Sequence, residues 1–273
     1  MQRRFLVSPL NIISSGWSNR KLILRLAWRE IESRYKSSIL GMLWAVLVPL
    51  LMLAVYTLVF SVIFESRWGN RLTNKLEFSL VLFAGMICFN FFAECINRAP
   101  GLMHENISFI KKVVFPLNIL AWVVVLVALF NALISFFVLL TAYIIVFGTP
   151  PLTILLLPIV VAPLFLLTLS LTWVLSSLGV YVRDIRQAVG IFVTVLMFLS
   201  PIFYPMEAVP AKLKFAIWIN PLGISLEWVR GAMFWGLVPQ IDSYIIFLVI
   251  SLIFVWLSAS WFEATKKGFA DVI

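Results

Sequence analysis

Few residues of this chain could carry out chemistry on a substrate. His104 is the single histidine, which excludes a zinc site of the HExxH type and any site built from two histidines. No G-x-x-x-x-G-K-[ST] segment occurs, so we expect no ATP bound through a phosphate-binding loop. Cys88 and Cys95 lie about 10 Å apart along one helix, too far for a disulfide. We therefore expect no catalytic residue, no metal site and no cofactor held by this chain.

The carboxylates are scattered as well. Glu65, Glu77, Glu207 and Glu227 are scattered along the outer side, whereas an enzyme acting on lipid-linked sugars should show a cluster of acids at one membrane face. Glu94 is the charge nearest to the interior of an apolar segment. A proton- or ion-coupled transporter keeps ionisable residues there. Neither chemistry nor ion coupling is indicated, and energy for transport must come from elsewhere.

The composition indicates that the chain lies in a lipid bilayer. Of its 273 residues 63% are hydrophobic and only 12% are charged, against about 25% charged in soluble domains. These values predict an all-α, polytopic membrane protein. The net charge of +9 fits basic cytoplasmic loops, and no nucleic-acid partner is expected.

The long apolar windows predict six transmembrane helices within residues 39–262, because about 20 apolar residues cross a bilayer. Val113 to Tyr181 carries no charge and is too long for one crossing. Its "FGTPP" segment (147–151) predicts a turn between two antiparallel helices, and "VRDIR" closes the second. The other four spans are expected at Met42–Phe64, Phe78–Ile96, Gln187–Tyr204 and Ser243–Phe262.

The segment between the last two spans, "PMEAVPAKLKFAIWINPLGISLEWVRGAMFWGLVPQ", is apolar but rich in proline and charge. Neither half is long enough to span. We expect two short re-entrant helices broken at Asn220–Pro221, because such backbone is tolerated where protein or an aqueous cavity surrounds it.

Lysine and arginine set the orientation. The side that holds the N-terminus carries more than twice as many of them as the other side. By the positive-inside rule this side is cytoplasmic. Residues 1–38 and the tail 263–273 are therefore expected in the cytoplasm, with both termini inside.

A basic, amphipathic stretch precedes the first span. One face carries Ala27, Trp28, Ile31 and Tyr35, and the next face carries Arg25, Arg29, Glu32 and Lys36. Such a helix lies in the cytoplasmic interface, either as an anchor that fixes orientation or as a docking surface. Glu30 and Glu32 favour docking, because a lipid anchor has little use for acids whereas a protein partner does.

Six segments in register resemble one family. They are "LAWREIESRYKSSILGMLWAVLVPLLMLAVYTLVFSVIF", "FIKKVVFPLNIL", "VRDIRQ", "LSPIFYPMEAVP", "INPLGISLEWVRGAMFWG" and "KKGFADVI". Together they are similar to the ABC-2 type permeases that export O-antigen and related polysaccharides. The resemblance covers nearly the entire chain and implies a single ABC-2 type transmembrane domain over residues 1–273.

The resemblance also implies partners. The chain would be an inner-membrane permease subunit that forms a homodimer and binds two copies of a separate ATPase, which holds ATP and Mg. The complex would export a lipid-linked polysaccharide. Two alternatives stay open: an ABC-2 permease for a teichoic-acid precursor, capsule, lipid or drug, and a membrane-embedded transferase acting on lipid-linked sugars.

Site residues follow from the resemblance. The amphipathic helix and the loop 98–112 would dock the ATPase through Arg29, Glu30, Glu32, Arg34, Tyr35, His104, Glu105 and Asn106. The first and fifth spans would line the path with Tyr56, Phe60, Phe203 and Tyr204, although periodicity alone does not separate a lumen from a packed seam. The re-entrant pair would form a periplasmic rim with Trp218, Asn220, Pro221, Glu227 and Arg230.

The orientation can be tested by cysteine labelling. In a chain without Cys88 and Cys95, Thr149→Cys should react with a membrane-impermeant reagent applied from the periplasm, and Ser108→Cys should not. The reverse pattern would overturn the orientation.

Overall fold

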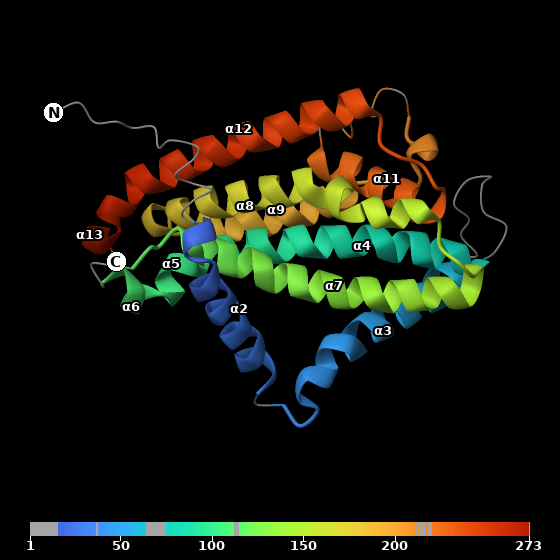
Figure 1. Cartoon of the computed structure of the whole chain (residues 1–273), viewed down its shortest axis with the longest axis horizontal. Coiled ribbons are helices and arrows are strands. Elements are labelled where there is room, and N and C mark those ends of the chain that lie inside the picture. Colours follow the sequence, from blue (N-terminus) through green and yellow to red (C-terminus); the bar gives the residue numbers. More distant parts are fainter. Residues whose placement is uncertain are drawn as a thin grey trace.

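The computed structural model describes residues 16–36, 38–63, 75–111, 115–210, 212, 217 and 220–272. These residues form helices and connecting turns without a strand, which confirms the predicted all-α fold (Figure 1). The α-helices of more than four residues are α2 (Arg20–Tyr35), α3 (Trp44–Tyr56), α4 (Lys75–Arg98), α7 (Ile119–Phe147), α8 (Leu157–Tyr181), α9 (Ile185–Leu199), α11 (Pro221–Phe234) and α12 (Ile241–Thr265).

Shorter pieces complete these helices. A 3₁₀ turn (Gly41–Leu43) precedes α3, and a π-helical segment (Thr57–Ile63) extends it. Three short pieces follow α4: a 3₁₀ turn (Ala99–Gly101), α5 (Leu102–Glu105) and α6 (Ile107–Ile110). The remaining pieces are 3₁₀ turns at Leu152–Leu156, Met206–Ala208 and Lys266–Gly268, and the C-terminal α13 (Phe269–Val272).

Five helical segments within the described residues are long and apolar enough to cross a membrane: Gly41–Phe60, Leu76–Glu105, Ile119–Phe147, Leu152–Tyr181 and Ile241–Val272. They coincide with five of the six predicted spans. Gly148 separates α7 from α8 with a φ of 83°, a backbone conformation that favours glycine. The predicted turn at "FGTPP" is therefore confirmed.

The sixth expected span, Gln187–Tyr204, is shorter than predicted. Helix α9 has 15 residues, about 22 Å of helix, whereas the hydrocarbon core is about 30 Å thick. It stops at Ser200, whose backbone is extended, because a residue before proline is disfavoured in the helical region and Pro201 follows. Six complete spans are therefore not confirmed.

Helix α4 is the centre of the bundle. In its membrane-spanning window 78% of residues are buried, against 11% in that of α3. It packs against α7, α8, α9 and α11, while α12 lies along α8. In Figure 1, α5, α6 and α13 gather at the left-hand end of the bundle. Helix α2 runs from this end to a turn below the bundle, and α3 rises from that turn towards the opposite end. The connection between α7 and α8 lies at the opposite end.

Helices α8 and α12 are joined near that left-hand end. The hydroxyls of Ser177 and Thr265 lie 2.7 Å apart, and Tyr181 donates a hydrogen bond to the Thr265 carbonyl at 2.9 Å. Small and hydroxyl-bearing residues let transmembrane helices approach closely and bond across the contact. The C-terminal part of α12 is thereby fixed to α8.

A buried arginine holds the other end of the bundle together. Arg230 of α11 is fully buried, and its guanidinium donates to the carbonyls of Val81, Pro201 and Ile202. Glu227 Oε1 lies 3.4 Å from Nη1 of the same arginine. A Cβ added at Gly85 would lie 2.4 Å from the Arg230 Nη2 atom, so only glycine leaves room for this group. Arg230 therefore links α11, α4 and the segment that follows α9.

Replacing Gly85 tests this link. Gly85→Ala should displace the guanidinium from its carbonyl acceptors, at a cost of about 2 kcal/mol for unmet buried hydrogen bonds. We expect the unfolding midpoint in detergent to fall by roughly 4–8 °C.

Gly190→Ala is the matched control, because nothing lies within 4 Å of a Cβ at this helical position. An unchanged midpoint for Gly85→Ala would mean that the Arg230 hydrogen bonds do not hold the fold.

Candidate functional site

Helix α2 is one wall of the candidate site. It buries Ile23, Ala27 and Ile31, spaced by four residues, against Ile119, Val123 and Val127 of α7. The apolar face expected from the sequence is thus confirmed at Ala27 and Ile31, and Ile23 completes it. Trp28 is not part of this buried face, since 54% of it is exposed. The face that we expected to rest among lipid headgroups packs on α7.

The loop after α4 is the other wall. Leu102 and Met103 of α5 are buried, so His104 and Glu105 are turned outward. The Asn106 amide donates to the Leu102 carbonyl at 2.9 Å and closes the turn between α5 and α6. A Cβ at Gly179 would lie 2.1 Å from the Pro100 carbonyl oxygen. The loop is therefore seated directly on the backbone of α8.

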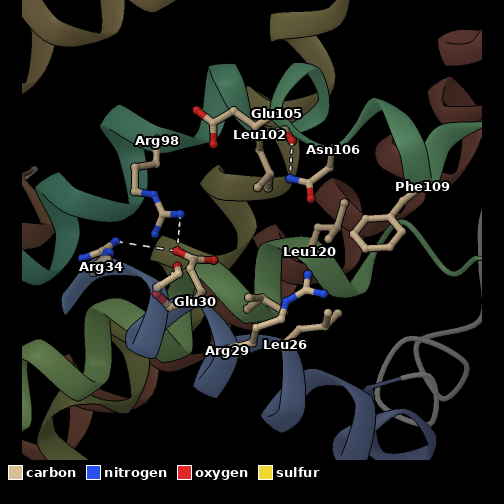
Figure 2. Close-up of a pocket in the computed structure, with 12 residues that line it drawn as sticks. Leu26, Arg29, Glu30, Arg34, Arg98, Leu102, Glu105, Asn106, Phe109 and Leu120 are labelled. Atoms are coloured by element: carbon tan, nitrogen blue, oxygen red, sulfur yellow. Dashed lines mark hydrogen bonds and ion pairs between the residues drawn. The ribbon is translucent and has the colours of Figure 1, made fainter. Parts of the chain in front are cut away.

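The two walls enclose a cavity of about 530 Å³ (Figure 2). Its lining mixes charged, amide and apolar side chains: Leu26, Arg29, Glu30, Ser33, Arg34, Arg98, Leu102, Glu105, Asn106, Phe109, Leu120 and Val123. We call this cavity the docking groove. Figure 2 shows Arg29 and Glu30 reaching from α2 towards the loop that carries Asn106.

The structure brings five of the eight predicted docking residues to this groove. They are Arg29, Glu30, Arg34, Glu105 and Asn106. The other three, Glu32, Tyr35 and His104, belong to the same two walls but do not line the groove. Two segments that the sequence separates by some 70 residues thus form one surface.

An ion-pair network joins α2 to α4 beside the docking groove. Arg34 Nη1 lies 2.7 Å from Glu94 Oε1, and Arg98 pairs with Glu30. Arg34 also approaches Glu30 at 3.7 Å. Glu30 therefore has two arginine partners, Arg34 and Arg98, and Arg34 lies between Glu30 and Glu94. The Asn131 amide of α7 donates to both oxygens of Glu94, at 3.2 and 2.9 Å. We call Glu30, Arg34, Glu94 and Arg98 the α2–α4 network.

Two members of the predicted docking set therefore have partners inside the chain. Glu30 and Arg34 bind α4, whereas no ion pair joins Arg29 or Glu105 to another described residue. Neither Arg98 nor Asn131 is among the residues that the sequence predicts for the site. The sequence feature that indicates such partners is the position of Glu94 at the end of an apolar span, where a charge needs a partner.

The predicted channel aromatics come together at the far end of α3. The rings of Phe60 and Phe203 stack with centroids 6.1 Å apart, and Tyr56 lies 6.3 Å from Phe83 of α4. The Tyr204 hydroxyl donates to the Phe198 carbonyl at 3.1 Å. A π-helical segment begins at Thr57, directly after Tyr56, and such segments are frequent at functional sites. The contact joins the first and fifth predicted spans.

The predicted rim residues have mixed positions. Helix α11 begins at Pro221, where Asn220 caps it by accepting from the Leu222 amide at 3.0 Å. The break between two re-entrant helices remains a prediction. Glu227 lines a second cavity of about 480 Å³, lined mostly by apolar residues. Arg230 points into the core instead. Trp218 and most of the first expected re-entrant helix lie outside the described residues.

Helices of spanning length with a polar groove at one end define a polytopic membrane protein. Among the described residues, no three His, Cys, Asp or Glu side chains gather to hold a metal ion. The model of the ABC-2 type transporter family matches residues 21–234, and the chain belongs to this family.

Several curated proteins are similar over nearly the whole chain. The O-antigen export system permease protein RfbA of Myxococcus xanthus is 26% identical over 97% of this chain and 100% of its own length. A protein of the same name from Klebsiella pneumoniae is 24% identical over 92% and 95%. The polysialic acid transport protein KpsM of Escherichia coli is 24% identical over 93% and 97%.

Proposed function

We propose that the chain is the transmembrane subunit of an exporter that carries a lipid-linked polysaccharide, O-antigen or similar, across the inner membrane. A separate ATPase, present in two copies with its ATP and Mg, drives the transport. The permease works as a homodimer with both termini in the cytoplasm.

The docking groove carries this proposal. It brings charged, amide and apolar side chains from two distant segments to one end of the bundle, and this mixture is typical of a protein–protein contact. Arg29 and Glu105 are exposed and have no ion-pair partner among the described residues, so their charges are available to a second protein. Glu30 and Arg34 shape the groove from inside.

The path of the glycan is proposed beside the stacked pair of Phe60 and Phe203. This pair joins the π-helical segment that extends α3 to the turn that follows α9. Helices α3 and α9 both leave apolar faces uncovered, which a second copy and lipid would cover. Aromatic rings suit a sliding sugar chain, because contacts along a conduction path must admit the cargo and still release it.

A capsular polysaccharide is the second candidate cargo. The likeness to a polysialic acid transport protein over 93% of the chain favours it. The two candidates share the docking groove and the path, and differ only in the glycan.

The partner can be tested by co-purification. The double substitution Arg29→Glu with Glu105→Lys reverses both available charges of the groove. We expect at least tenfold less ATPase retained on the tagged permease, equal to about 1.4 kcal/mol or more of lost binding. Membrane insertion should be unchanged, because neither residue has an ion-pair partner within the described chain.

Arg25→Glu is the control for that experiment. Arg25 is exposed on α2 but does not line the groove, so its reversal should leave the complex intact. Equal retention by the double variant and by Arg25→Glu would exclude the groove as the docking surface.

The path can be tested by removing its rings. Tyr56→Ala with Tyr204→Ala should lower surface polysaccharide severalfold, measured by immunoblot, while the ATPase still co-purifies. The conservative pair Tyr56→Phe with Tyr204→Phe keeps both rings and should export normally. Normal export by the alanine pair, or loss of glycan together with loss of the complex, would make these aromatics packing residues only.

A further inference from the structure

The α2–α4 network repeats one pattern on two helices. Glu30 precedes Arg34 by four residues on α2, and Glu94 precedes Arg98 by four residues on α4. Residues four apart share a helix face, and a glutamate before the basic residue is the favourable order for a pair within a helix. Each helix therefore contains a complete acid–base pair of its own.

In the structure the shortest ion pairs cross between the helices. Arg34 of α2 lies 2.7 Å from Glu94 of α4, and Arg98 of α4 binds Glu30 of α2, while Arg34 keeps a longer contact of 3.7 Å with Glu30 on its own helix. No ion pair joins Glu94 to Arg98, although both are described. All four charges are neutralised across the contact, so the network holds α2 on α4.

The exchanged arrangement leaves one group unsatisfied. Nη1 of Arg98 is buried and has no hydrogen-bond partner among the described residues. Buried polar groups are nearly always bonded, so such an atom calls for an explanation. A pair with Glu94 on its own helix would bring the Arg98 guanidinium to a carboxylate that Asn131 already holds from α7. A second arrangement is thus available without moving α4 from α7.

Partial exposure makes the exchange feasible. Arg34 and Glu94 side chains are 32% and 22% exposed, and those of Arg98 and Glu30 are 25% and 26% exposed. Fully buried charges that lose a partner are strongly penalised, whereas these charges keep contact with water during the change. Neither arrangement leaves a charge without an opposite charge nearby.

We propose that Glu30, Arg34, Glu94 and Arg98 form a switch with two states. In one state Arg34 binds Glu94 and Arg98 binds Glu30 across the contact, as in the structure. In the other state Arg34 keeps only Glu30, Arg98 binds Glu94 on its own helix, and α2 is released. This inference rests on the proposed function, because the force on α2 comes from the ATPase in the docking groove. The four residues are positioning residues, and they transmit the movement of α2 to α4 without contacting the glycan.

A double charge swap distinguishes the switch from a static brace, in which the four charges only hold α2 on α4 and never exchange partners. Arg34→Glu with Glu94→Arg keeps an opposite charge across every α2–α4 pair. It also places acids at both network positions of α2 and bases at both positions of α4, so pairing within each helix becomes repulsive. We expect the double swap to insert as the unmodified permease does, and to lower surface glycan at least tenfold for each ATPase that it retains, because Arg34 also lines the docking groove.

A fourfold swap supplies the matched control. Adding Glu30→Arg and Arg98→Glu to the double swap restores opposite charges both between and within the helices. Export should then recover to within about threefold of the unmodified level. The order of charges within each helix is reversed, which accounts for an incomplete recovery.

Three measurements are made on each variant in cells: permease abundance in the membrane, co-purified ATPase and surface glycan. Blocked export in the double swap with recovery in the fourfold swap supports the switch. Normal export by the double swap overturns it in favour of a static brace. Loss of glycan that only matches the loss of ATPase from the double swap also overturns it, because the substitution would then act on docking alone. Failure of export in both assembled variants overturns the exchange.

These outcomes are distinct from failure of the proposed function. An unmodified permease that retains no ATPase would reject the partner itself. A permease that binds its ATPase and exports glycan, but tolerates the double swap, would reject only the switch.

Discussion

A charge on a helix in an apolar setting must find its partner within the protein, because hydrocarbon offers none. This constraint decides the structure at both ends of the bundle. At one end Arg230 collects three main-chain carbonyls and fixes α11 against α4. At the other end Glu94 is neutralised by Arg34 of α2 and accepts hydrogen bonds from the Asn131 amide of α7. The position of α11 depends on the Arg230 hydrogen bonds, and that of α2 depends on the Arg34–Glu94 ion pair.

The shortness of α9 and the burial of Arg230 belong together. Pro201 ends the helix, and the turn that follows presents the carbonyls of Pro201 and Ile202 to the interior. Such carbonyls need donors when water is absent. Arginine supplies several donors in a fixed plane, and Gly85 provides the space for them. The turn that precedes Phe203 is thereby held, which also sets the ring stack with Phe60.

Much of the fold could be predicted from apolar length and turn residues. The positions of five spanning segments, the turn at Gly148 and the start of α11 at Pro221 follow from local signals, whereas the ends of the spans differ by up to ten residues from the predicted ones. Side-chain pairing could not be predicted in the same way. Glu30 and Arg34 appear on the sequence as part of a charged surface, and only the packing of α2 on α7 turns them towards α4. Helical periodicity gives a face and does not name what lies opposite.

The burial of Arg230 was missed for the same reason. An arginine between apolar residues near a predicted membrane surface suggests a solvated rim. Its acceptors come from α4 and from the turn after α9, far away in sequence. Trp28 is the opposite case, since its hydrophobic side chain suggested the buried face whereas the smaller Ile23 occupies it.

The close approach of Pro100 to Gly179 gives the two walls of the groove different stiffness. Backbone rests on backbone there, and α8 is in turn bonded to α12 through Ser177 and Tyr181. A force applied to α5 is therefore transmitted directly to α8 and α12, because no flexible side chain separates the loop from α8. Helix α2 rests on three aliphatic side chains and a set of exchangeable charges. A protein bound to both walls would therefore keep the loop after α4 in place and move α2 relative to it.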